Sequence, residues 1–211
     1  MSFLQFEKQE KKINKNYFFA GTFLVIIINF LVYYFFSEQD VIYSTYNWEN
    51  VLDFKNLFIC FYSAFRHFNV QHLLLNCLCF LIAGGYVERK RGSLELIVLV
   101  VLFTFFGEGM TDANHYSGTS RGFSGVNYAF YAYIIVDFIF SFKEIKKNKK
   151  EMIISVSILI LIYIACCFCG GTDTISFKIY PYDLIHNLGH YTGFLVGLIL
   201  STLIKVCKIK R

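Results

Sequence analysis

The sequence predicts an all-α polytopic membrane protein in which six transmembrane helices form one compact bundle. Of its 211 residues, 56% are hydrophobic and 17% are charged, whereas a soluble domain is roughly 25% charged. Six apolar segments follow one another along the chain, and lysines and arginines gather between alternate pairs of them. These observations exclude a disordered chain and a small disulfide scaffold, and they disfavour a water-soluble enzyme.

The six apolar segments define the expected helices in order. A spanning helix needs about 20 mostly apolar residues, and suitable segments lie at about 17–37, 70–87, 93–107, 123–142, 152–170 and 184–204. The first follows a lysine-rich terminus without an obvious small-residue cleavage site, so we interpret it as a retained span and not as a signal peptide. The second reaches spanning length only by including His72 and Asn76. Polar residues inside a membrane are functional-site hypotheses by default.

Lysines and arginines orient the expected spans, because short cytoplasmic loops carry an excess of them. Four lie in the N-terminal segment, three in the loop at 88–92, five in the loop at 143–151 and four in the tail, so 16 of 20 fall on one side. We therefore expect a cytoplasmic segment at 1–16, a membrane domain at 17–204 and a cytoplasmic basic tail at 205–211. The second, fourth and sixth spans then begin at the outer surface. Because topology explains the positive charge, a nucleic-acid partner is not expected.

A glycine-flanked serine opens the fourth expected span, in the sequence Gly122-Phe123-Ser124-Gly125. Backbone N–H groups at a helix start can face a developing oxyanion, so this serine is a candidate nucleophile. A capping serine with small-residue helix packing explains the same motif. For the motif taken alone, that structural interpretation is favoured.

Glycines at 189, 193 and 197 recur every four residues and form one smooth stripe on the sixth expected span. Such a stripe lets a helix approach its neighbour closely, and the fourth span is the natural partner. If the sixth helix starts near Asp183, His190 lies about 10 Å below the outer surface. Imidazole exchanges protons near neutral pH, which suits a general base. A core histidine bonded to a neighbouring group is the structural alternative.

His72 and Asn76 are four residues apart and therefore share one face of the second expected span. Both side chains can donate hydrogen bonds without carrying charge, which suits an oxyanion site. Polar bonding between helices explains the pair equally well when it is considered alone. Together with Ser124 and His190, however, the pair lies at comparable depth on three helices that run the same way. That coincidence favours a hydrolytic site.

These motifs together resemble those of the rhomboid intramembrane serine proteases. The resemblance extends from about residue 65 to residue 200. It is carried by HFNVQHLLLN at 67–76, GGYVERKRGS at 84–93, GFSGVNYAF at 122–130 and GHYTGFLVG at 189–197. Rhomboids have a histidine and an asparagine four residues apart in the second helix, a GxSG serine at the start of the fourth, and a histidine followed by GxxxG in the sixth.

The resemblance implies a serine endopeptidase that uses a two-residue dyad and needs no metal or cofactor. Ser124 would be the nucleophile, His190 its base, and the oxyanion would be held by His72, Asn76 and the Ser124 backbone N–H. Supporting positions of the family are matched by Tyr128, His67, Gly122, Gly125, Gly193 and Gly197. Glu88 and its basic neighbours match a family loop of structural role.

The resemblance also implies the partners and the setting of the protein. The substrates would be transmembrane segments of other proteins, cut near the outer membrane face, with small residues at the cut. Six spans with short tails resemble the compact prokaryotic form of the family. We therefore expect an integral protein of a prokaryotic cell membrane, in contact with lipid, with the active site opening outward. The oligomeric state stays open.

Two features depart from a complete match or limit the mechanism. Many rhomboids carry a Trp-Arg pair in the first outer loop, and the matching region FKNLFICFYSAFRHF lacks it, with the single tryptophan at Trp48. The contacts of that loop with lipid or substrate are therefore open. Asp137 lies thirteen residues beyond Ser124, hence about 20 Å deeper, so it cannot orient His190. We expect it to pair or to reach toward the inner surface.

Other functions compete with serine proteolysis. His186 and His190 are spaced like the ligands of HExxH zinc proteases, but Asn187 stands where the catalytic glutamate is needed. A non-catalytic rhomboid-like protein typically lacks the serine or the histidine, and this chain has both. A transporter is disfavoured because paired broken helices are missing. The seven cysteines are odd in number and mostly lie in apolar segments, which predicts neither a disulfide framework nor a metal site.

Overall fold

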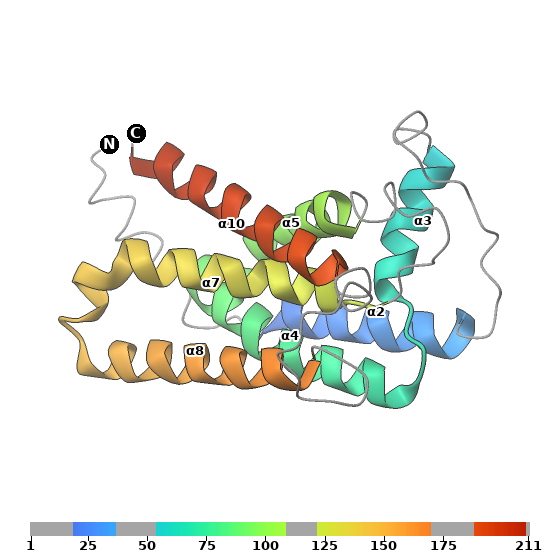
Figure 1. Ribbon diagram of the computed structural model, residues 1–211, viewed down its shortest axis with the longest axis horizontal. Coiled ribbons are helices and arrows are strands. Elements are labelled where there is room, and N and C mark those ends of the chain that lie inside the picture. Colours follow the sequence, from blue (N-terminus) through green and yellow to red (C-terminus); the bar gives the residue numbers. More distant parts are fainter. Residues whose placement is uncertain (1–18, 37–53, 109–121, 170–187, 210–211) are drawn as a thin grey trace.

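The structure is a computed structural model that describes residues 19–36, 54–108, 122–169 and 188–209. These ranges contain helices and no strand, which confirms the all-α class. Most of the helices lie lengthwise in one bundle, and α3 stands at a steep angle at one end (Figure 1). The elements are α2 (Ala20–Phe36), α3 (Phe54–Phe65), α4 (Val70–Arg91), α5 (Ser93–Phe103), the π-helical turn η1 (Thr104–Glu108), α7 (Ser124–Ile145), α8 (Lys149–Cys169) and α10 (Leu188–Ile209).

Helices α2, α4, α5 with η1, α7, α8 and α10 overlap the six apolar segments, but not all of them have the length expected of a membrane span. Within the described residues, three are long and apolar enough to cross a membrane: Val70–Arg91, Ser124–Ile145 and Gly189–Cys207. The apolar helices Ala20–Phe35 and Ser93–Gly107 are shorter. The structure therefore supports a membrane protein with three candidate spans, and six spans stay a prediction. The expected helix start at Asp183 lies outside the described residues.

Helix α3 occupies part of the region that sequence analysis treats as the first outer loop. Its 12 residues extend about 18 Å, too short to cross a bilayer. The chain leaves α3 at Phe65 and enters α4 at Val70. There Asn69 caps the new helix, because its Oδ1 accepts a hydrogen bond from the His72 N–H at 2.8 Å. This short connection holds the start of α4 beside the end of α3.

Helices α7 and α10 pack backbone to backbone, as the glycine spacing predicts. A Cβ added at Gly193 would collide with the Gly125 carbonyl, and one added at Gly197 would collide with the Ala129 carbonyl. A Cβ at Gly107, in η1, would lie 3.5 Å from the Gly193 Cα. Side chains at Gly193 and Gly197 would push α10 away from α7, whereas a Cβ at Gly107 would make an ordinary contact, so glycines of α10 set the spacing of these two helices.

An aromatic cluster fills the core on the side where α7 begins. The Phe80 ring contacts Phe123 and Phe130 edge-on at centroid distances of 5.1 and 5.5 Å, and Phe65 lies 5.1 Å from Phe123. Phe80, Phe123 and Phe130 are at most 1% exposed. The cluster joins α3, α4 and α7 and fixes the backbone immediately before Ser124.

The opposite end of the bundle holds a buried ion cluster around Asp137. This carboxylate accepts hydrogen bonds from the Tyr86 hydroxyl at 3.0 Å, from Lys90 Nζ at 3.0 Å, from an Arg91 guanidinium N–H at 3.2 Å and from Lys205. The expectation that Asp137 pairs is confirmed. Its cationic partners come from α4 and α10, so the cluster ties both helices to α7.

Glu88, near the end of α4, binds the start of α2. Its carboxylate accepts the backbone N–H groups of Gly21 and Thr22 at 2.8 Å each, the Thr22 hydroxyl at 2.6 Å and the Ser93 hydroxyl at 2.5 Å. A carboxylate at a helix N-terminus satisfies N–H groups that lack helical partners. The loop expected at 88–92 is wrong, because α4 continues to Arg91 and Glu88 lies within it; the bonds of Glu88 join α4 to α2.

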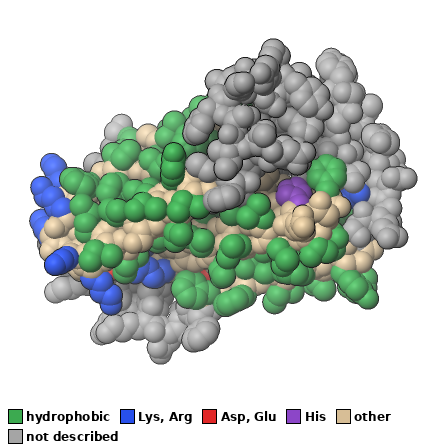
Figure 2. Space-filling view, turned by 60° about the horizontal axis from the view of Figure 1, so that its bottom comes forward, with side chains coloured by type: hydrophobic (Ala, Val, Ile, Leu, Met, Phe, Trp, Pro, Cys, Tyr) green, Lys and Arg blue, Asp and Glu red, His purple; other side chains and the backbone are tan. Residues whose placement is uncertain are grey.

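Most of the basic side chains visible in Figure 2 lie at the end of the molecule opposite the candidate site. On the face shown in Figure 2, most lysine and arginine side chains gather at one end, and the visible histidine lies near the other. Hydrophobic side chains cover much of the surface between them. This arrangement is typical of a protein whose apolar middle contacts lipid.

Candidate active site

Ser124 and His190 meet where α7 and α10 cross. Ser124 is the first residue of α7 and His190 the third of the described part of α10. The His190 Nε2 lies 2.9 Å from the Ser124 Oγ, within hydrogen-bond range. The close glycine packing of the two helices makes this separation possible, because bulkier residues would move His190 away.

Tyr128 holds the plane of the His190 ring. It lies one turn beyond Ser124 on α7, and the two rings stack with centroids 4.5 Å apart and an angle of 8° between planes. Stacking restricts rotation of the imidazole about its side-chain bonds. The Nε2 atom is therefore kept toward Ser124.

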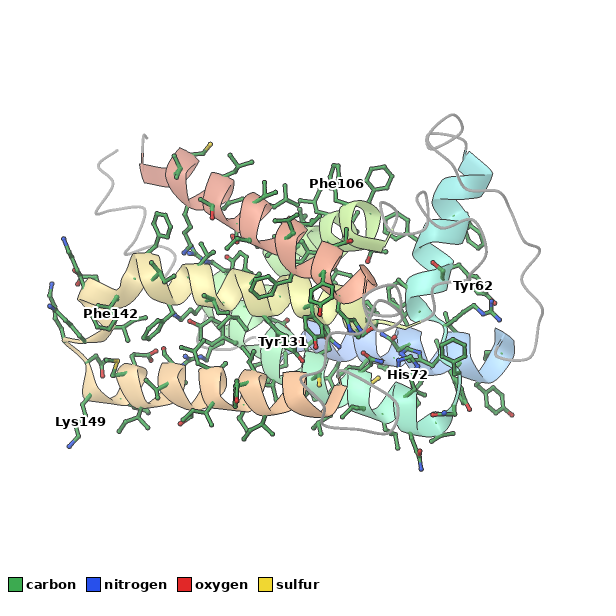
Figure 3. All side chains as sticks on the ribbon, viewed as in Figure 1. Tyr62, His72, Phe106, Tyr131, Phe142 and Lys149 are labelled. Carbon is green, nitrogen blue, oxygen red and sulfur yellow. The ribbon has the colours of Figure 1, made fainter. Side chains whose placement is uncertain are left out.

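The backbone before Ser124 adopts a conformation that suits glycine. Gly122 has φ +125°, which other residues rarely adopt. A Cβ there would lie 2.6 Å from His72 Cε1, 2.8 Å from His72 Nε2 and 3.7 Å from Asn76 Nδ2. The two side chains from α4 thus bring polar nitrogen atoms to Gly122, two residues before the serine. Figure 3 shows His72 at the end of the bundle remote from Lys149.

His67 supports the same segment from the connection between α3 and α4. Its Nδ1 lies 3.1 Å from the Phe65 carbonyl, which can only accept, so Nδ1 carries the proton. Its Nε2 accepts a hydrogen bond from the Phe123 N–H at 3.5 Å. Burial and the neighbouring His72 lower the pKa of His67 to about 4, although the Phe65 carbonyl opposes this. His67 is therefore neutral at pH 7 and can accept the Phe123 N–H.

The start of α7 presents backbone donors beside Ser124. The first helical hydrogen bond runs from the Asn127 N–H to the Phe123 carbonyl at 3.0 Å. The N–H groups of Ser124, Gly125 and Val126 precede it and have no helical acceptor. The Gly122 N–H donates to the Ser63 carbonyl at 3.4 Å. The Ser124 N–H is thus positioned to donate to an anion next to Ser124 Oγ.

Asn127 is a polar residue at the site that sequence analysis misses. It is 2% exposed, and its Nδ2 donates to both the backbone carbonyl and the side-chain Oδ1 of Asn76 at 3.1 Å. Its sequence signal is an amide side chain three residues after Ser124, in the mainly apolar first half of α7. The sequence alone does not reveal that the partner of this amide is Asn76.

The structure brings most of the candidate residues together at one end of the bundle, whereas Asp137 lies with its cations at the other. His186 and Asn187, on which a zinc protease depends, lie outside the described residues. Across the residues that are described, no group of three or more His, Cys, Asp or Glu side chains could hold a metal ion.

A family model described as the Rhomboid domain matches residues 55–206. Curated proteins named rhomboid protease GlpG, from Salmonella choleraesuis, Salmonella newport and Salmonella typhimurium, are each 32% identical to this chain over 117 residues. The match covers 54% of this chain and 42% of each relative, so the matched part spans less than half the length of these relatives.

Proposed function

The chain belongs to the rhomboid family, and from this premise we propose that it is an intramembrane serine endopeptidase that cleaves transmembrane segments of other proteins. The observation that carries the proposal is the 2.9 Å contact between Ser124 Oγ and His190 Nε2, with the imidazole stacked on Tyr128. A serine hydroxyl bonded to a neutral imidazole can lose its proton as the oxygen attacks a carbonyl.

In the proposed mechanism Ser124 is the nucleophile and His190 transfers protons in both halves of the reaction. His190 Nε2 takes the proton of Ser124, and Ser124 Oγ attacks the peptide carbonyl. The oxyanion accepts hydrogen bonds from the Ser124 N–H, His72 Nε2–H and Asn76 Nδ2–H, donors that need little rearrangement during the reaction. Protonated His190 then gives its proton to the departing amine. Water, activated by the same imidazole, releases the acyl group from Ser124.

The gathering of basic side chains at the end remote from Ser124 supports a membrane orientation. Because positive residues remain on the cytoplasmic side, we propose that both termini are cytoplasmic and that the site opens toward the outer face of a prokaryotic cell membrane. Six spans fit this orientation. A peptide bond inside a helix is shielded by its own hydrogen bonds, so the substrate helix must unwind near the site before it is cut.

A cleavage assay in liposomes tests the proposal. The wild type, Ser124→Ala and His190→Ala are compared on a panel of single-span substrates with small residues near the outer end. Ser201→Ala is the matched control, because Ser201 is buried in α10 and donates to the Gly197 carbonyl of its own helix.

We expect the wild type and Ser201→Ala to cleave and the two dyad variants to lose almost all activity. Equal cleavage by Ser124→Ala or His190→Ala would refute the dyad. Inhibition by a chelator would favour a metalloprotease. A folded wild type that binds the substrates but cleaves none of them would favour a binding function.

A further inference from the structure

Asn127 reaches across from α7 to α4 and contacts Asn76 twice. Its Nδ2 lies 3.1 Å from the Asn76 backbone carbonyl oxygen and 3.1 Å from the Asn76 Oδ1. Among the described residues, its own Oδ1 is buried without a hydrogen-bond partner. A buried acceptor without a partner destabilises the fold, so an apolar residue would suit packing better. The amide donor therefore calls for another explanation.

Two backbone carbonyls determine which way both amides point. A carbonyl oxygen only accepts, so the atom of Asn127 beside the Asn76 carbonyl is the nitrogen. This nitrogen also lies beside the Asn76 side chain, which must present its oxygen there. The other end of the Asn76 amide lies 3.0 Å from the His72 carbonyl and is therefore its nitrogen. The orientation follows from hydrogen-bond chemistry alone.

This orientation places a donor beside Gly122, two residues before Ser124. The Asn76 Nδ2 carries two protons, and one is donated to the His72 carbonyl. The same nitrogen lies on the Gly122 side of α4, 3.7 Å from the position of a Cβ at Gly122. Rotating the amide by half a turn would place its oxygen against the His72 carbonyl and its nitrogen against the Asn127 nitrogen. It would also present an oxygen where an oxyanion forms.

We infer that Asn127 is a positioning residue of the active site, which locks the Asn76 amide with its nitrogen toward the oxyanion. Asn127 does not touch the reacting atoms and acts only through Asn76. The inference rests on the proposed function, because an oxyanion forms only if Ser124 attacks a carbonyl.

A double-mutant cycle with kinetics tests the inference. Asn127→Leu removes the donor with little change in size, Asn76→Ala removes the oxyanion donor, and the double variant combines them. Asn29→Leu is the matched control: Asn29 is also buried, but its Nδ2 donates to the Val25 carbonyl of its own helix, α2. Thermal unfolding of every variant is measured alongside.

Loss of one oxyanion donor lowers kcat by about 10²-fold or more. Asn127→Leu leaves the donor in place, still bonded to the His72 carbonyl but no longer fixed at its oxygen by Asn127, so we expect a fall in kcat of about tenfold with KM unchanged. The double variant should match Asn76→Ala in kcat, because Asn127 has no side-chain amide to orient once residue 76 is alanine. Asn29→Leu should keep the wild-type kcat. A wild-type kcat in Asn127→Leu would overturn the inference. So would a double variant whose fold-decrease in kcat equals the product of the two single fold-decreases.

A second measurement does not depend on activity. In protein labelled with ¹⁵N-asparagine, the side-chain NH₂ signals of Asn76 are assigned by their loss in Asn76→Ala. They should move in folded Asn127→Leu and stay in place in Asn29→Leu. Unchanged Asn76 signals in Asn127→Leu would overturn the inference even if the wild type cleaves. Cleavage by Ser124→Ala would instead overturn the proposed function, while the NMR result would still decide the Asn76 orientation.

Discussion

The substitution Gly122→Ala perturbs the candidate site by a single methyl group. The added Cβ would lie 2.6 Å from His72 Cε1 and 2.8 Å from His72 Nε2, whereas carbon atoms in contact are about 3.5–4.0 Å apart. The His72 ring and the segment before Ser124 must therefore separate by about 1 Å. A shift of this size at a catalytic group can lower the rate by about 100-fold.

The same substitution also strains the backbone, because φ at Gly122 is +125°. A non-glycine residue in such a conformation costs about 1–3 kcal/mol. Gly92→Ala is a matched control: Gly92 has φ +89° and follows α4 at the end of the bundle remote from Ser124. Both variants should lower the melting temperature, but only Gly122→Ala should lower kcat.

The assay measures substrate cleavage in liposomes, normalised to the amount of folded protein, together with thermal unfolding. We expect kcat of Gly122→Ala to fall by about 100-fold and kcat of Gly92→Ala to stay within about twofold of the wild type. Wild-type kcat in Gly122→Ala would refute the argument that His72 must lie against a bare backbone. An equal loss of kcat in Gly92→Ala would show that backbone strain, and not the contact with His72, lowers the kcat of Gly122→Ala.

Three further predictions concern other parts of the molecule. Asp137→Ala leaves buried cations without their anion and should lower the free energy of unfolding by about 3–5 kcal/mol. Glu144→Ala breaks an exposed ion pair and should lower it by at most about 1 kcal/mol, and denaturant or thermal unfolding measures both. The pKa of His67 is lowered to about 4 in the folded protein, so between about pH 6.5 and 4 the unfolded chain binds more protons than the folded one. The free energy of unfolding should therefore decrease as the pH is lowered from about 6.5 to 4, and unfolding curves of His67→Leu should show a smaller decrease. Tyr128→Phe keeps the ring stacked on His190 and should keep kcat within a few-fold, whereas Tyr128→Leu should lower it by about tenfold or more in the cleavage assay.

Each of these predictions has an outcome that contradicts it. Equal destabilisation by Asp137→Ala and Glu144→Ala would mean that the ion cluster does not join the helices. A stability curve that falls as steeply in His67→Leu as in the wild type would remove His67 as the cause. Equal kcat in Tyr128→Phe and Tyr128→Leu would show that the stacked ring does not hold His190.

Hydrophobic pattern and glycine spacing predict much of the fold. Apolar segments locate the helices because burial in lipid or protein requires a continuous apolar stretch. The glycines at 193 and 197 predict the packing of α10 on α7, because close approach depends on the absence of a Cβ. Helix α3 is missed because it is short, and a 12-residue segment gives little sequence signal to separate a helix from a loop.

The candidate site is predictable only in part. Ser124, His190, His72 and Asn76 stand out because polar residues are rare in apolar helices and each occurs at the start of a segment that runs the same way. Asn127 is also polar and near the start of α7, but its contact with Asn76 depends on the rotation of α7 relative to α4, which a single sequence does not show. The partners of Asp137 come from α4 and α10, and a single sequence shows its depth but not the side chains that surround it.

Reaction with a fluorophosphonate, followed by mass spectrometry of the intact protein and its peptides, tests the dyad most directly. Such a reagent forms a covalent adduct with a serine only when the hydroxyl is activated as a nucleophile. The dyad predicts a single adduct on Ser124 in the wild type and almost none in folded His190→Ala. Labelling of another serine, or equal labelling of Ser124 in the wild type and in His190→Ala, would contradict it.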